Sequence, residues 1–149
     1  MAAGRIRWKL IVLGGLFAEA TVMAVFFLLL LAANVAGVPE VARPFSTLDY
    51  VDAMVSSFVT VFVFTVWVGK RIEADFVLHG VLIGAFGIVL FAIMWIATTG
   101  SFAQPSLYLV AHVLKVLGGV AGGLVARNRK RRGLAAGQAR VGGRLANRE

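Results

Sequence analysis

The sequence predicts an all-α integral membrane protein whose four transmembrane helices form an up-down-up-down bundle. Hydrophobic residues make up 60% of the 149-residue chain, well above the roughly 45–50% that is typical of soluble domains. They are gathered in four long runs, and a helix needs about 20 mainly apolar residues to cross a bilayer. The chain has no cysteine, which excludes disulfide scaffolds, thiol nucleophiles and Cys-ligated metal sites.

The four candidate spans are separated by short connections. Each is long enough to approach or exceed the roughly 30 Å hydrocarbon core at about 1.5 Å per residue. The stretch from Ser46 to Asp49 predicts a capped start before the second span, and Gly100 predicts the end of the third. Short connections make consecutive helices antiparallel neighbours. The approximate spans are 10–35, 51–68, 76–98 and 106–126.

Positive charge predicts that both termini are cytoplasmic. All but Arg43 and Lys115 of the 15 basic residues precede the first span, occupy the second connection or follow the fourth span. Lys and Arg beside membrane spans are retained on the cytoplasmic side. We therefore expect a bacterial inner-membrane protein with a basic cytoplasmic N-terminus (1–9), a membrane domain (10–126) and a basic, disordered cytoplasmic tail (127–149). A cleaved signal peptide is the alternative for the first span, but its apolar stretch is too long.

Glycine-rich faces on the first, third and fourth spans predict close helix packing, because small residues let helix backbones approach in lipid. The second span carries bulky aromatic residues and no comparable face. We expect the three glycine faces to join near the cytoplasm and to leave a crevice in the outer half. The packing glycines are Gly14, Gly15, Gly80, Gly84, Gly87, Gly118, Gly119, Gly122 and Gly123.

Two charged residues, Glu19 and Lys115, lie deep inside the apolar runs, far from either end of their spans. Each is about 14 Å deep in a layer about 30 Å thick, counted from opposite sides, so both reach the midplane. A charge there is costly, and we expect an intramembrane ion pair or a shared proton. The pair is interpreted either as a structural link that fixes the register of the helices or as a proton- or ion-sensitive element. A third alternative is that Lys115 extends to the membrane surface and never meets Glu19.

Other polar residues predict one polar cleft in the outer half of the bundle. His112 lies one turn outward from Lys115 and could relay protons, or could simply fill a helix contact. Asp52, Ser56 and Thr60 recur every four residues on the second span and form a polar stripe. Asp49 and Asp52 could hold a cation, or could serve the positive N-terminal end of that helix.

The basic residues after the fourth span predict contact with anionic phospholipid at the cytoplasmic face rather than with nucleic acid, because they begin directly at the end of a membrane helix. The chain contains no catalytic signature such as a G-x-S-x-G elbow, an H-E-x-x-H helix or a P-loop. We expect no catalytic residue, no metal and no cofactor. The lipid-contacting residues are Arg127, Arg129, Lys130, Arg131 and Arg132.

Three short segments resemble a known pattern: Val68 to Arg71, Leu78 to Gly80, and Gly118 to Gly123. They are similar to the YrzE-like group of small four-span bacterial membrane proteins, with its Gly-x-Arg turn, its His-Gly in the third helix and its Gly-rich fourth helix. The resemblance covers roughly residues 10–128. It implies an uncharacterised integral membrane protein and assigns no functional residue.

The function expected from these patterns is that of a non-enzymatic accessory or assembly subunit, acting as a homo-oligomer or within a membrane complex and packing through its glycine-rich faces. The alternative is a small transporter or channel. It would use the cleft of Glu19, Lys115 and His112 for protons, ions or a small amphiphilic anion.

Overall fold

Four helices make up the described part of the protein. The computed structural model describes residues 6–38 and 46–146, and within them the chain is all-helical with no strand. All four helices are long and apolar enough to cross a membrane, which confirms the four-helix prediction. Arg5, Arg43 and Arg148, which contribute to the charge pattern, lie outside the described residues. The helices are α1 (Trp8–Val35), α2 (Thr47–Gly69), α3 (Phe76–Thr99) and α4 (Ser106–Ala146).

Local capping explains where the middle helices begin and end. α2 starts at Thr47, earlier than the predicted residue 51, because the Ser46 hydroxyl accepts a hydrogen bond from the Asp49 N–H at 3.2 Å. α3 ends at Gly100, which adopts a left-handed conformation with φ of 67° and donates its N–H to Ile96 O at 2.8 Å. Both of these sequence signals are confirmed.

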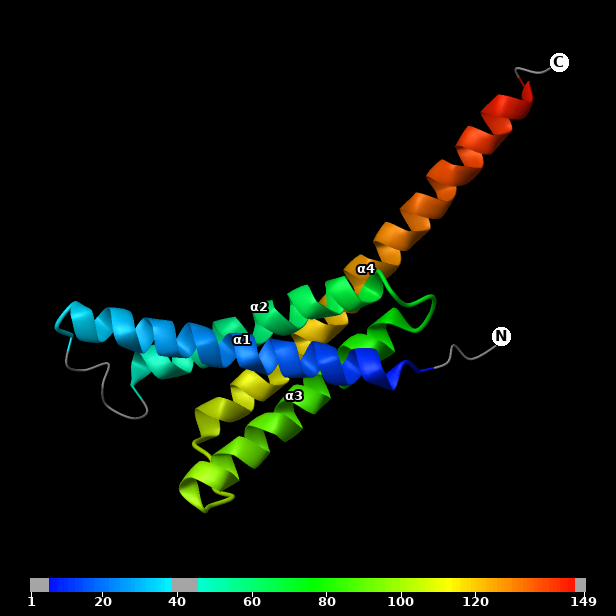
Figure 1. Cartoon of the computed structure of the whole chain (residues 1–149). Helices are drawn as coiled ribbons and strands as arrows, with labels where there is room; N and C mark the ends of the chain where they lie inside the picture. The colour runs from blue at the N-terminus through cyan, green and yellow to red at the C-terminus, as the bar shows by residue number, and fades with distance from the viewer. Residues whose placement is uncertain (1–5, 39–45, 147–149) are drawn as a thin grey trace.

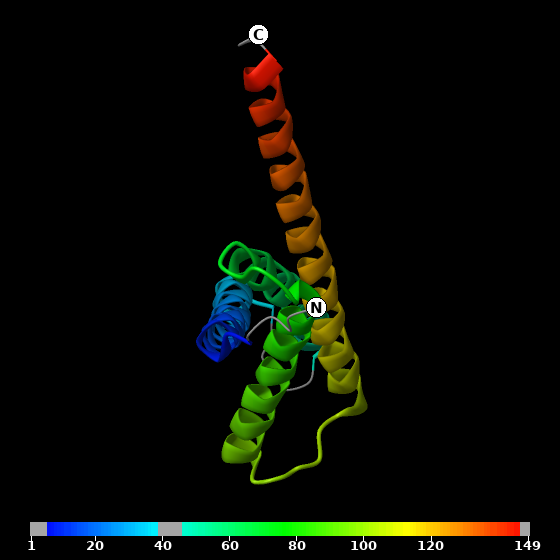
Figure 2. The same ribbon diagram turned by 90° about the vertical axis from the view of Figure 1, so that its right-hand side faces the viewer.

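The helices form two pairs that cross each other. The α1 and α2 ribbons lie across the α3 and α4 ribbons at a clear angle, and α4 runs on well beyond the other three (Figure 1, Figure 2). α4 packs most extensively against α2 and then α3, whereas α1 packs against α2 and α3 and has little direct contact with α4. α3 and α2 therefore separate the first helix from the last.

Glycines bring α3 and α4 into backbone contact. A Cβ atom added to Gly80 would overlap the carbonyl group of Gly119, and one added to Gly119 would overlap that of Gly80. A Cβ atom on Gly84 would lie 2.8 Å from Lys115 O. These positions accept no larger side chain without moving a backbone, as the small-residue rule for membrane helices requires.

The glycine face of α4 also packs against α2, whereas the sequence predicted that the glycine faces of the first, third and fourth spans join one another. Cβ atoms on Gly118 and Gly122 would lie 2.5 and 2.7 Å from the carbonyl oxygens of Phe58 and Phe62. α2 needs no glycine stripe of its own, because the glycines of α4 already create the room. Gly14 of α1 packs against Ile83 of α3 and Val68 of α2, and Gly15 packs against α3, so neither meets α4.

The basic segment after Ala126 is helical in the structure rather than disordered as the sequence analysis expects. α4 continues without a break to Ala146. The physical reason is that Arg, Lys, Leu and Ala all favour helix, and they outnumber glycines such as Gly133, each of which costs about 1 kcal/mol relative to Ala.

We predict that Gly119→Leu destabilises the bundle by about 3 kcal/mol or more, because the new side chain meets a backbone group that cannot rotate away. The matched control is Gly133→Leu, since a Cβ atom at Gly133 meets nothing within 4 Å. Thermal unfolding in a mild detergent measures both variants. Equal melting temperatures for the two variants would contradict the backbone contact.

Candidate functional site

The structure brings Glu19 and Lys115 together in the middle of the bundle. Lys115 Nζ donates a hydrogen bond to Glu19 Oε1 and forms an ion pair with it. Glu19 is 3% exposed and Lys115 is 2% exposed, so neither side chain is reachable from outside. Because an unpaired charge in such surroundings costs several kcal/mol, the two residues are held as a pair.

The room for this ion pair comes from α3. Gly84 lets the α4 backbone approach at Lys115, and Gly87 leaves space for the carboxylate, since a Cβ atom there would lie 2.7 Å from Glu19 Oε1. The sequence predicted that α1 and α4 touch through their own small-residue faces. That expectation is wrong, because the two side chains reach each other past the glycine face of α3.

Phe91 covers the ion pair on the side where α3 ends. Lys115 Nζ lies 5.1 Å from the centre of the Phe91 ring, a cation–π contact that adds to the carboxylate pairing. Glu19 Oε2 is buried and accepts no hydrogen bond from any described residue. The ammonium group thus has a charged and an aromatic partner, while one carboxylate oxygen is left without a donor.

His112 lies one turn before Lys115 on α4 but has its own hydrogen-bond partner. Its Nε2 lies 3.1 Å from Gln104 Oε1, and its ring meets Phe91 edge-on at 5.2 Å between centroids. Because an amide oxygen only accepts hydrogen bonds, Nε2 carries a proton and donates it to Gln104. His112 Nδ1 is buried without a partner among the described residues.

The hydroxyl groups in the polar stripe of α2 donate hydrogen bonds within their own helix. Ser56 Oγ donates to Asp52 Oδ1 at 2.6 Å, and Thr60 Oγ1 donates to the Ser56 carbonyl oxygen at 2.6 Å. Such bonds to a residue one turn earlier are common for Ser and Thr in helices. All three side chains are buried.

The expectation of one polar cleft is therefore wrong. A cavity of about 310 Å³ does lie where α3 ends and α4 begins, but among the expected cleft residues only Asp52 lines it. Phe91 lies between the cavity and the ion pair, and the hydroxyls of α2 are engaged within their helix. All four helices contribute to the cavity, which is lined by Val22, Met23, Phe26, Phe27, Asp49, Asp52, Ala53, Phe91, Trp95 and Tyr108.

An aromatic cluster centred on Tyr108 forms the wall of this cavity, and sequence reasoning missed it. The Tyr108 ring centre lies 5.4 Å from that of Tyr50, 5.4 Å from that of Phe91 and 5.6 Å from that of Trp95. The Tyr108 hydroxyl donates to Asp49 Oδ2 at 2.7 Å. We call the end of the bundle that contains Asp49, Asp52 and Tyr108 the acidic end. Tyr50, Trp95 and Tyr108 all lie near span ends in the sequence, which was the available signal, but this does not show that their rings converge.

The opposite end of the bundle, which we call the basic end, is tied by hydrogen bonds that the sequence did not predict. Arg7 donates its N–H to His79 Nε2 at 3.2 Å and its guanidinium to Arg71 O at 2.9 Å. Because a backbone N–H only donates, Nε2 accepts, and Nδ1 carries the proton that it shares with Asp75 O at 2.9 Å. His79 is therefore a structural link between α1 and α3.

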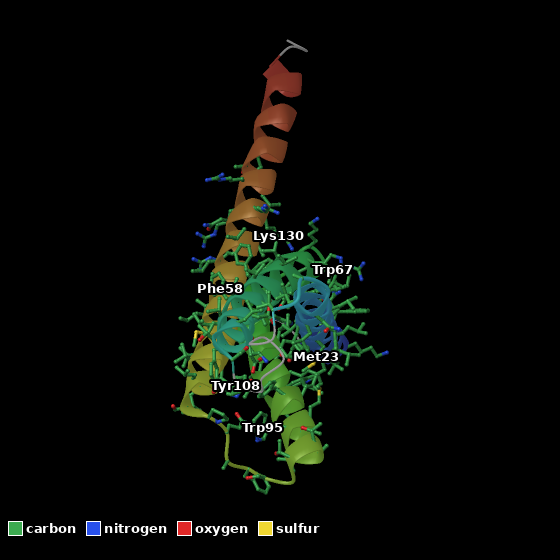
Figure 3. All side chains as sticks on the ribbon, turned by 90° about the vertical axis from the view of Figure 1, so that its left-hand side faces the viewer. Met23, Phe58, Trp67, Trp95, Tyr108 and Lys130 are labelled. Atoms are coloured by element: carbon green, nitrogen blue, oxygen red, sulfur yellow. The ribbon has the colours of Figure 1, made fainter. Side chains whose placement is uncertain are left out.

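Lys70, just after α2, and two basic residues of α4 line a second cavity of about 310 Å³ at the basic end. Its lining residues are Val66, Gly69, Lys70, Ala126, Arg129 and Lys130. Lys130 is half-buried and donates to Ile72 O at 3.1 Å. The other predicted lipid-contacting residues, Arg127, Arg129, Arg131 and Arg132, are exposed. Figure 3 labels Lys130 and Trp67 toward this end, and Trp95 and Tyr108 toward the other.

Comparison with protein-family models, curated proteins and solved structures found no match for this chain. The resemblance to the YrzE-like group therefore stays a prediction. Among residues 6–38 and 46–146, no three His, Asp or Glu side chains are grouped so that they could hold a metal ion.

We predict that Glu19→Gln and Lys115→Met each lower the free energy of unfolding by about 3–5 kcal/mol, because each leaves one buried charge without its partner. The double variant should recover most of that loss, since it buries no charge. Chemical unfolding in detergent, analysed as a double-mutant cycle, measures the coupling. If the double variant loses as much free energy of unfolding as the two single variants together, the two residues act independently.

Proposed function

We propose that this protein is a multi-pass protein of a bacterial inner membrane, with an up-down-up-down topology and both termini in the cytoplasm. Four helices of suitable length and apolarity support the membrane location. The contacts of Arg7 with Arg71 and of Lys130 with Ile72 support the orientation, because they gather basic segments at one end. The second cavity, with Lys70 and Arg129, suits the phosphate of an anionic lipid at the cytoplasmic surface.

Introduced cysteines test this orientation, since the chain has none of its own. In intact cells, a membrane-impermeant maleimide should label Ser101→Cys in the α3–α4 connection. It should label Ala74→Cys, in the α2–α3 connection, only after the membrane is opened. Both positions are exposed. The opposite labelling pattern would invert the proposed topology.

For its role, we propose a non-enzymatic accessory or assembly subunit. The observation that carries this proposal is that the centre of the bundle is closed: its glycine faces are filled by neighbouring helices, and Glu19 and Lys115 neutralise each other there. A closed centre favours a structural role over a path for solutes. It also means that the glycine faces are not free for partners, which differs from the sequence analysis.

The surface proposed for a partner is instead the apolar exterior of α1. α1 is the least buried of the four helices, and its Phe27, Leu28 and Leu31 side chains are 65%, 64% and 59% exposed. In a bilayer these side chains meet lipid tails or another membrane helix. Large apolar side chains on one helix that has few contacts of its own suit a transmembrane partner or a second copy of this chain.

Native mass measurement in mild detergent should find the protein bound to a partner or to itself, rather than alone. A photo-crosslinker placed at Leu28 should capture that partner. One placed at Val113, an exposed residue of α4, should not. A chain that is monomeric at its natural abundance in every mild detergent, with no crosslink from Leu28, would contradict the accessory role.

A small transporter is the second candidate, and one observation favours it. The cavity at the acidic end has Phe91 in its lining, and the same ring contacts Lys115 of the buried ion pair. A rotation of the Phe91 ring would connect the cavity with the ion pair. The charged residues that line the cavity are acidic, which favours a cation over the anion considered in the sequence analysis. An ion flux in liposomes that Glu19→Gln abolishes without unfolding the protein would favour this role.

A further inference from the structure

The cavity at the acidic end combines negative charge with aromatic rings. Asp49 and Asp52 line it from α2, and Phe91, Trp95 and Tyr108 line it from α3 and α4. Four side chains of α1 complete an apolar wall: Val22, Met23, Phe26 and Phe27. A volume of about 310 Å³ lies at the lower end of the range for small-molecule sites and fits a small organic molecule.

Asp52 brings to this cavity a carboxylate that has no positive partner among the described residues. The residue is only 6% exposed. Its Oδ1 accepts the Ser56 hydroxyl, and its Oδ2 accepts no hydrogen bond from any residue that the structure describes. Asp49 keeps its Tyr108 bond, but neither aspartate forms an ion pair within the described ranges. A buried carboxylate without a positive partner is costly, so the cavity favours a cation.

The rings decide which kind of cation fits. Tyr108 lies 5.4 Å from Phe91 and 5.6 Å from Trp95 between ring centres, and Phe91 stacks on Trp95, so the three rings form one aromatic cluster beside the cavity. Aromatic faces attract ammonium groups, and quaternary ammonium ligands are typically held by such groups of rings. A metal ion fits less well. Ca²⁺ takes six or more oxygen ligands, whereas this cavity offers two carboxylates in a mainly apolar wall.

We propose that this cavity is a binding site for an organic ammonium ion that carries an apolar group. Asp52 holds the charge, the Phe91, Trp95 and Tyr108 rings enclose the ammonium carbons, and the α1 side chains contact the apolar group. The site is additional to the accessory role proposed above and does not depend on it. Such a ligand could be a soluble amine or the headgroup of an ethanolamine or choline lipid.

The probe for this site is benzyltrimethylammonium, measured by calorimetry and by tryptophan fluorescence with the full chain in nanodiscs of phosphatidylglycerol. We expect saturable binding of the probe and much weaker binding of neopentylbenzene, a neutral molecule of the same shape. Binding of benzenesulfonate should be absent. Equal binding of the charged and neutral probes, or no saturable binding of the ammonium probe, would overturn the proposal.

Variants identify the residues that bind the probe. Asp52→Asn should weaken binding at least about 10-fold, because it removes one partner of a buried charge pair. The matched control is Glu73→Gln, the same charge change at an exposed residue of the basic end, and it should leave binding unchanged. If Asp52→Asn does not fold, Ala53→Leu tests the site by filling the cavity. Unchanged binding in a folded variant of either kind would overturn the proposal.

The lipid of the nanodisc distinguishes the two sources of the ammonium group. If phosphatidylethanolamine or phosphatidylcholine lowers the apparent affinity for the probe, the site accepts a lipid headgroup. If neither lipid competes while the probe still binds, the site takes a soluble amine. Both results retain the ammonium site, and neither bears on whether α1 binds a partner.

Discussion

One buried ion pair sets the arrangement of the whole bundle. Glu19 and Lys115 belong to helices that hardly touch each other, yet their side chains meet at the centre of the molecule. Neither charge is stable alone in apolar surroundings, so α1 and α4 must stay within side-chain reach. α3 meets this requirement with glycines at the two places where the pair needs space, opposite Lys115 and beside the Glu19 carboxylate.

The buried ion pair lies between two ends of the molecule that carry different charged residues. At the basic end, Arg7 and Lys130 tie the helices through backbone carbonyl groups. At the acidic end, Asp49 and Tyr108 join α2 to α4 beside a cavity. The closed centre lies between these ends. A protein built this way has a tightly packed centre, and the two cavities lined by charged residues lie toward its two ends.

Sequence reasoning worked where one physical rule acts alone. Apolar run length predicted the helices, and equal depth from opposite surfaces predicted that Glu19 could meet Lys115. It failed where several helices must be placed at once. Nothing in a one-dimensional pattern shows that Gly87 faces Glu19, or that Ser56 bonds within its own helix and leaves Asp52 at a cavity. The aromatic cluster around Tyr108 was missed for the same reason, since its members come from three helices.

The most direct test of the central ion pair is solid-state NMR in lipid bilayers, with ¹⁵N in the lysine ammonium groups and ¹³C in the glutamate carboxyl groups. This structure predicts a strong dipolar coupling between Lys115 Nζ and Glu19 Cδ, as expected for atoms in direct hydrogen-bonded contact. The coupling should disappear when Lys115 is replaced by Met. A Lys115 signal that couples instead to lipid phosphorus, with no coupling to Glu19, would contradict the account.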